Sequence, residues 1–215
     1  MQMPKTAIIL GATGLTGSLV LDQLLSDDRY DTVKLFSRSS CGIEHEKIQE
    51  FLGDLLEMEQ FKADFTGDEV YCCIGTTKKK TPDKELYRAI DFGIPATAAQ
   101  LAKENHVQGF AVVSALGANS KSLFEYNRIK GDMEKAVKES GIKSTYILQP
   151  SLIVGDRNEH RSGEGFAAGL FRFLKPIMIG PLKKYRAVEA KDIAAKMIAV
   201  LNSGVPSQTI PSQEI

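Results

Sequence analysis

Residues 8–25 read IILGATGLTGSLVLDQLL, an apolar run that passes through Gly11, Gly14 and Gly17 into a segment with helical periodicity. Glycines suit a strand-to-helix turn of this kind because the turn is tight, because a diphosphate approaches its backbone closely, and because the helix packs against the strand. The start of that helix offers free amide groups and the positive end of its dipole to phosphates. The stretch therefore predicts dinucleotide binding. A tight turn without a ligand is the alternative interpretation.

The rest of the chain repeats this alternation of apolar, β-rich segments with helical patterns, which indicates a parallel sheet covered on both faces. Strands are expected at residues 5–10, 32–37, 47–54, 69–75, 108–114 and 144–150, and helices at 14–27, 82–105, 126–140 and 191–204. The fold class is thus α/β, a single doubly wound Rossmann-type domain over residues 1–215. We expect residues 1–150 to form its nucleotide-binding core. Residues 151–215 would then form a small lobe that shapes a substrate pocket and does not fold independently.

Composition narrows the class of partner. Lys plus Arg and Asp plus Glu both number 27, so no overall field attracts nucleic acid. No apolar run reaches the roughly 18 residues of a membrane span, and the start of the chain lacks the pattern of a secretory signal. We therefore expect a cytoplasmic protein with a small-molecule substrate, no nucleic acid and no membrane. The three cysteines and three histidines make no metal-ligand spacing, so no metal site is expected.

The second expected strand ends in LFSRSS, which points to the coenzyme. NAD-binding sheets usually place an acidic residue here for the ribose hydroxyl, whereas this chain has Ser37 and Arg38. An arginine at this position can pair with the 2'-phosphate of NADP. NADP(H) is therefore favoured over NAD(H). A surface arginine in contact with solvent is the alternative.

Several motifs in this order carry a resemblance to a known family. They are GATGLTG at 11–17, GDL at 53–55, CCIGTT at 72–77, VVSALGA at 112–118, YNRIK at 126–130 and LQPSLIVGDR at 148–157. Together they resemble the atypical short-chain dehydrogenase/reductase superfamily, and most closely its Tat-interacting-protein-like oxidoreductase branch, which includes small bacterial members. The resemblance implies strand order 3-2-1-4-5-6-7 and NADP(H) bound along the carboxyl edge of the sheet.

The resemblance also implies which residues contact the coenzyme. Gly11, Thr13, Gly14, Leu15 and Thr16 would hold the diphosphate, Ser37 and Arg38 the adenosine phosphate, Asp54 and Leu55 the adenine, Gly75 and Thr76 the ribose and nicotinamide side, and Pro150, Ser151 and Leu152 the back of the nicotinamide.

Three further residues are candidates for catalysis. Tyr126 precedes Lys130 by four residues on an expected helix, so their side chains are neighbours. Short-chain dehydrogenases pair such residues with a serine at the end of the fifth strand, here Ser114. Tyr126 would donate a proton to the alkoxide that hydride transfer leaves, with its pKa lowered by Lys130, while Ser114 would bond the carbonyl oxygen. Two ordinary side chains on an amphipathic helix are the alternative.

These residues predict an NADPH-dependent reductase of a small carbonyl compound. A non-catalytic NAD(P)H-binding redox sensor, which would act through a protein partner, is the second hypothesis. A flavin-type or biliverdin-type reductase, which would use the glycine turn without Tyr126, is the third. A polar loop at Asp156, Arg157, Asn158, His160 and Arg161 would lie at the pocket mouth, either to meet an anionic substrate or only in solvent. The apolar segment at 166–180 is expected in the core.

Overall fold

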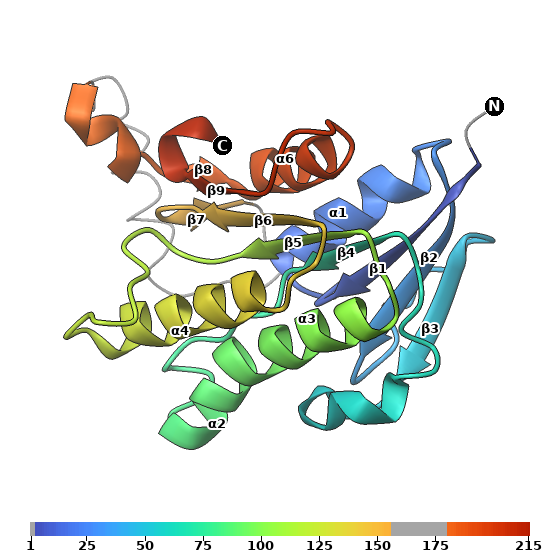
Figure 1. Cartoon of the computed structure of the whole chain (residues 1–215), viewed down its shortest axis with the longest axis horizontal. Coiled ribbons are helices and arrows are strands. Elements are labelled where there is room, and N and C mark those ends of the chain that lie inside the picture. The colour runs from blue at the N-terminus through green and yellow to red at the C-terminus, as the bar shows by residue number, and fades with distance from the viewer. Residues whose placement is uncertain (1–2, 156–179) are drawn as a thin grey trace.

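A computed structural model of the chain describes residues 3–155 and 180–215, and its centre is a sheet of seven parallel strands (Figure 1). The order across the sheet is β3-β2-β1-β4-β5-β6-β9, which confirms the expected Rossmann topology. The strands are β1 (Lys5–Leu10), β2 (Tyr30–Ser37), β3 (Ile48–Leu52), β4 (Glu69–Cys72), β5 (Gly109–Val113), β6 (Ser144–Gln149) and β9 (Gln208–Pro211). All pair in parallel, so their carboxyl ends lie along one edge.

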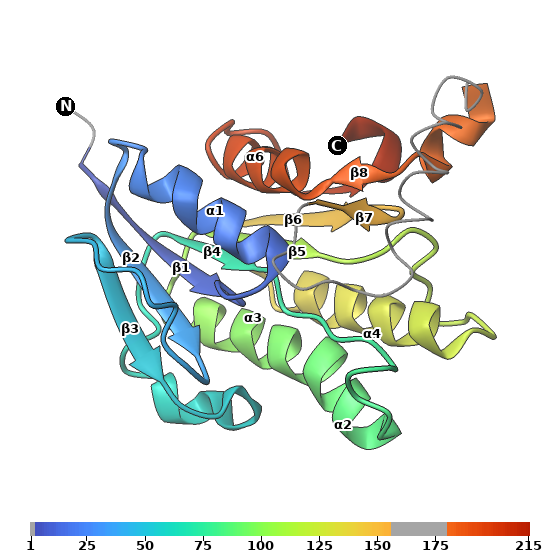
Figure 2. The ribbon, with the colours of Figure 1, turned by 180° about the vertical axis from the view of Figure 1, so that it is seen from behind.

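Helices cover both faces of this sheet, as Figures 1 and 2 show from opposite sides. The main helices are α1 (Leu15–Leu25), α2 (Lys84–Arg88), α3 (Ile94–Glu104), α4 (Glu125–Glu139) and α6 (Ala190–Leu201). Alternate residues of β1 face opposite sides, so Ala7 and Ile9 pack with α1 and α6. Ile8 and Leu10 pack on the other side with α3 and α4. The two apolar clusters sandwich the sheet and fix its carboxyl edge relative to the helices.

All six strands expected from the sequence are present. The strand expected at 47–54 is β3, an edge strand whose residues are exposed or only partly buried, which explains its faint apolar pattern. The seventh strand, β9, was not located from the sequence. It has four residues, one of them Pro211, and lies at the other edge of the sheet. Only one of the four is fully buried, so the strand has no clear apolar pattern.

The helix expected over residues 82–105 is interrupted. It consists of α2, a π-helical turn at Ala89–Gly93 and α3, and this corrects the expectation of one continuous helix. Pro95 provides the physical reason. Proline has no amide proton to donate to the carbonyl of Asp91, four residues before it, and its ring clashes with that carbonyl. The wider turn avoids this clash and turns Asp91 inward, where it is almost fully buried.

Local signals mark the ends of two helices. The cap of α2 is Asp83 rather than the nearby Thr81, and the Asp83 carboxylate accepts from the amide of Leu86 at 2.7 Å. Thr81 is instead buried, with its hydroxyl 2.9 Å from that of Thr76. Gly141, which follows α4, has a φ of 72°, the left-handed conformation in which glycine commonly ends a helix.

The last part of the chain joins the same sheet. It supplies α6, which packs beside α1, and the edge strand β9. A short parallel pair, β7 (Ile153–Val154) and β8 (Val188–Glu189), forms a separate two-stranded sheet. The polar loop at 156–161 lies outside the described residues, as does the apolar segment at 166–180 apart from its last residue. Within the described ranges, no helix is long and apolar enough to cross a membrane.

Candidate functional site

A cavity of about 660 Å³ opens at the carboxyl ends of β1, β4 and β5, where nucleotide-binding sheets hold their ligands. Nine of the residues predicted from the sequence line it: Thr13, Gly14, Leu15, Thr16, Gly75, Thr76, Ser114, Tyr126 and Lys130. The glycine turn and the catalytic candidates therefore face one space, although more than a hundred residues separate them in the sequence.

The glycine turn has the geometry that a dinucleotide needs. Gly11 has a φ of 87°, which side chains rarely adopt. A Cβ on Gly17 would lie 2.0 Å from the carbonyl oxygen of Gly11, so only glycine allows α1 to start so close to the strand. Gly14 precedes α1, and no side chain caps the amides of its first turn within the described structure. These amides and the helix dipole fit a diphosphate.

The four residues expected at the adenosine end do not line the cavity. Ser37 is buried, and its hydroxyl donates to the carbonyl of Ser39 at 2.7 Å, while Arg38 is exposed at the end of β2. Asp54 caps the 3-10 helix at Leu55–Phe61 by accepting from the amide of Leu56 at 3.0 Å. Leu55, the first residue of that helix, packs in the core. Arg38 is thus the one of the four with a side chain open to a phosphate.

Tyr126 and Lys130 lie on the inner face of α4, but Lys130 has a partner that the sequence did not indicate. Its ammonium Nζ is 2.8 Å from Oδ1 of Asp91, and the side chains are 5% and 1% exposed. Oδ2 of Asp91 accepts from the amide of Thr76 at 2.8 Å. The π turn, the loop after β4 and α4 are therefore joined at one buried ion pair, directly beside Gly75.

Burial and this ion pair together set the direction of the Tyr126 pKa shift. Burial raises the pKa of the Tyr126 phenol, Lys130 lowers it and Asp91 raises it again, so that the pKa lies above its ordinary value. Burial acts to lower the pKa of Lys130, yet Asp91 and the neighbouring acidic groups hold it above its ordinary value. The lowering of the Tyr126 pKa by Lys130 that we expected is present but outweighed.

Ser114 contacts a second carboxylate that was not anticipated. Its hydroxyl donates to Oε1 of the buried Glu134 at 2.5 Å, and the side-chain amide of Gln149 donates to the same oxygen at 2.8 Å. Because this proton is directed at Glu134, Ser114 presents its lone pairs to the cavity. It would have to rotate in order to donate to a carbonyl oxygen.

The remaining predicted residues lie beside the cavity. Pro150, Ser151 and Leu152 follow β6 but do not line it, although Ile153 does. The Ser151 hydroxyl donates to the carbonyl of Arg186, and the Leu152 carbonyl accepts from Val188 at 2.9 Å. These bonds tie this segment to β8.

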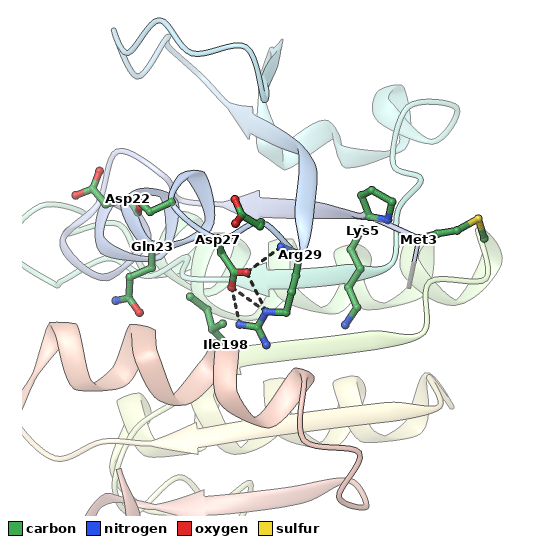
Figure 3. A pocket seen from close by; sticks show the side chains of 10 residues that line it. Met3, Lys5, Asp22, Gln23, Asp27, Arg29 and Ile198 are labelled. Carbon is green, nitrogen blue, oxygen red and sulfur yellow. Dashed lines mark hydrogen bonds and ion pairs between the residues drawn. The ribbon is translucent and has the colours of Figure 1, made fainter. Parts of the chain in front are cut away.

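A larger hollow of about 780 Å³ lies at the opposite, amino-terminal edge of the sheet (Figure 3). Its two basic side chains, Lys5 and Arg29, are already paired. Arg29 donates to both carboxylate oxygens of Asp27, and the Lys5 ammonium contacts Glu69 at 2.5 Å. Ligands of parallel sheets bind at the other edge. We therefore assign the functional site to the smaller cavity. No group of three potential metal ligands occurs in the described parts of the chain.

Sequence reasoning missed Asp91 and Glu134. Asp91 had one usable signal, since Pro95 four residues later rules out a regular helix there and indicates a distorted, inward-facing turn. Glu134 lies four residues after Lys130, as Lys130 does after Tyr126, so the spacing placed all three on one helix face. However, the apolar character of that face gave no reason to expect a buried carboxylate on it.

Comparison with known proteins agrees with this geometry. The sequence model of a family described as NAD(P)H-binding matches residues 11–203. Protein HTATIP2 of Rattus norvegicus is 30% identical over 171 residues, which are 78% of this chain and 70% of that protein. The mitochondrial protein FMP52 of Candida albicans is 29% identical over 206 residues, which are 93% and 89% of the two chains.

Solved structures agree on the fold. The enzyme WbmH of Bordetella bronchiseptica in complex with NAD+ superposes with a TM-score of 0.72 at 19% identity, covering 98% of this chain and 76% of that one. A UDP-N-acetylglucosamine 4-epimerase of Methanobrevibacter ruminantium gives 0.73 at 15% identity, covering 97% and 76%. Since the family match runs from the glycine turn to the end of α6, the chain belongs to the NAD(P)H-binding family and to the atypical short-chain dehydrogenase/reductase superfamily that its motifs resemble.

Proposed function

We propose that the protein is an NADPH-dependent reductase of a small carbonyl compound, with Tyr126 as the proton donor. The observation that supports it is that Tyr126, Lys130 and Ser114 line the same cavity as the glycine turn and the open start of α1. The glycine geometry fits a dinucleotide, and the family binds NAD(P)H. Tyr126 is then near the place where the reactive end of that dinucleotide would lie.

The reaction balances with groups that the site provides. When bound, a reduced nicotinamide supplies a hydride to the carbonyl carbon, and the C=O electron pair moves to the oxygen. That oxygen takes the proton of the Tyr126 hydroxyl, and the product is an alcohol. Tyr126 is 39% exposed, so its phenolate can recover a proton from solvent at the cavity mouth. Lys130 remains charged and would hold the nicotinamide ribose.

Arg38 supports the preference for NADPH. It is exposed at the end of β2, and β2 lies next to β1 in the sheet, so it can reach a 2'-phosphate of a coenzyme on the glycine turn. Within this proposal the substrate is a free small molecule, and neither nucleic acid nor a membrane takes part. We propose a cytoplasmic location, which cell fractionation can test; a mitochondrial location, the one that the name of the relative FMP52 gives, would contradict it.

The test is a fluorescence titration with NADPH and NADH, followed by addition of aldehydes, ketones and quinones to the bound complex. We expect tighter binding of NADPH and its oxidation by one class of carbonyl. Tyr126→Phe should reduce kcat by about 10²–10⁴-fold and change the Kd for NADPH by less than about twofold. Tyr185→Phe, at an exposed tyrosine outside the cavity, is the matched control and should change neither.

Two outcomes would count against the proposal. Normal turnover by Tyr126→Phe would reject the proton-donor role. Tight binding of NADPH that no carbonyl oxidises would favour the non-catalytic redox sensor instead, and the search would then turn to a protein partner.

A further inference from the structure

The buried pair of Asp91 and Lys130 has a consequence for the direction of the chemistry. Lys130 is 4% exposed and Asp91 1%, so solvent screens neither charge. Their atoms are 2.8 Å apart, and the second Asp91 oxygen accepts from the Thr76 amide. The carboxylate is therefore held in place from two sides, and the pair as a whole carries no net charge.

The backbone builds this pair into the fold. Pro95 prevents a regular helical turn, and the resulting π turn at Ala89–Gly93 directs Asp91 toward α4. Lys130 reaches it from the middle of α4, four residues after Tyr126. Neither side chain can leave without exposing the other as an unpaired buried charge, which costs several kcal/mol in proteins.

We propose that Asp91 is a positioning residue that fixes the site for reduction, because it neutralises Lys130 and so keeps Tyr126 as a proton donor. The inference rests on the proposed function, and it adds the direction of the reaction. Reduction of a carbonyl consumes the phenol proton. Oxidation of an alcohol requires the phenolate to accept the hydroxyl proton, and a site that keeps the phenol protonated disfavours that step at neutral pH.

The other titratable groups nearby do not take over the role of Asp91. Burial and Asp91 both raise the pKa of Tyr126, against the effect of Lys130. Other titratable groups around Tyr126 and Lys130 are Cys72 on β4, Cys73 and Lys80 after β4, Tyr87 on α2, and Glu125 and Glu134 on α4. Glu125 is paired with Lys78 at 2.8 Å, and Glu134 is bonded to Ser114 and Gln149.

The experiment measures the ionisation of Tyr126 directly. Tyrosine labelled with ¹³C at Cζ is titrated by NMR, and the signal of Tyr126 is assigned with Tyr126→Phe. Asp91→Asn keeps the shape of the side chain and removes its charge, so we expect the pKa of Tyr126 to fall by about one pH unit or more. Alcohol oxidation with NADP+ should begin at a correspondingly lower pH. Glu125→Gln is the matched control, and it should leave the Tyr126 signal unchanged.

A double variant covers the case in which Asp91→Asn does not fold. Asp91→Asn with Lys130→Gln replaces a balanced pair by a neutral one and leaves no buried charge. Its Tyr126 should titrate as in the wild type. An unchanged Tyr126 pKa in Asp91→Asn would overturn the inference, because Asp91 would then have no effect on Tyr126. A clear rise in the double variant would also overturn it, because Lys130 would then lower the Tyr126 pKa in the wild type despite Asp91. These titrations need no turnover, so they remain informative even if no carbonyl substrate is found.

Discussion

Gly17 shows how one residue determines the coenzyme site. It lies in the first turn of α1, and an added Cβ would meet the Gly11 carbonyl oxygen at 2.0 Å, closer than any relaxed contact. We expect Gly17→Ala to lower the free energy of unfolding by about 1–3 kcal/mol and to weaken NADPH binding, because α1 must move away from the turn. Urea denaturation and the fluorescence titration measure the two effects.

Gly93 provides the matched control for that substitution. It lies in the π turn with a helical φ of −60°, and a Cβ there meets nothing within 4 Å. Gly93→Ala should therefore be neutral or stabilise the protein by about 0.5–1 kcal/mol, since alanine costs less backbone entropy. Equal losses in the two variants would show that the close approach at Gly17 is not what requires glycine.

Residues in local sequence motifs could be predicted, whereas residues that contact them from distant segments could not. Thr13, Gly14, Tyr126 and Lys130 lie in short local patterns, and the structure brings them to one cavity. Asp91 meets Lys130 across 39 positions of chain, through a distorted turn. Such a contact depends on the packing of two helices, and local spacing does not encode it.

At the scale of elements, buried polar groups join the amino-terminal ends of β1, β2 and β4 to the end of α6. Oε2 of Glu69 accepts from the phenols of Tyr30 at 2.6 Å and Tyr71 at 2.7 Å, while Oε1 contacts Lys5. Asn202, after α6, donates to the Tyr30 oxygen at 2.6 Å. Glu69 is thus the common acceptor of the network. If it is removed, both phenols lose their carboxylate acceptor, and Lys5 keeps only its bond to Oδ1 of Asn202 at 2.8 Å.

We expect Glu69→Ala to lower the free energy of unfolding by about 3 kcal/mol, because two buried phenols lose their carboxylate acceptor and Lys5 loses its ion-pair partner. Glu139→Ala is the control, since Glu139 pairs with Lys135 at 3.8 Å on the exposed side of α4 and should contribute less than about 0.5 kcal/mol. Chemical denaturation of both variants measures the difference. Similar losses would mean that the network at the strand ends is no more important than a surface ion pair.

The expected helices show the same limit of local patterns. Alternation of strands and helices fixed the class and order of elements, because parallel sheets require crossover helices. The π turn before Pro95 was missed because it lies within a continuous helical pattern of apolar residues. The edge strand β9 was missed because it buries little surface. The π turn shapes the site and β9 forms one edge of the sheet. At both places tertiary contacts outweigh local preference.

For the whole molecule, burial of protonated acids sets the response to alkaline pH. Tyr30, Tyr71, Cys72 and Tyr87 are all at most 4% exposed. Burial is the main cause that raises the pKa of each, and it raises the pKa of Cys72 to about 11. In the unfolded chain a thiol loses its proton near pH 8.5 and a phenol near pH 10, values that we take as approximate. The unfolded state therefore binds fewer protons than the folded state once the pH exceeds these values.

Stability should consequently be constant up to about pH 8.5 and then fall, by about 1.4 kcal/mol per pH unit for each group that ionises only on unfolding. Cys72→Ala removes one of two neighbouring thiols whose pKa burial raises, and Cys73 remains, so its fall should be shallower than that of the wild type between about pH 8.5 and 10. Val112→Ala is the matched control, because Val112 is buried beside Cys72 on β5 and loses packing without losing a titratable group. Its urea midpoints should run below and parallel to those of the wild type across the pH range. If the curve of Cys72→Ala keeps the wild-type slope between about pH 8.5 and 10, the thiol is not what makes the folded state sensitive to base.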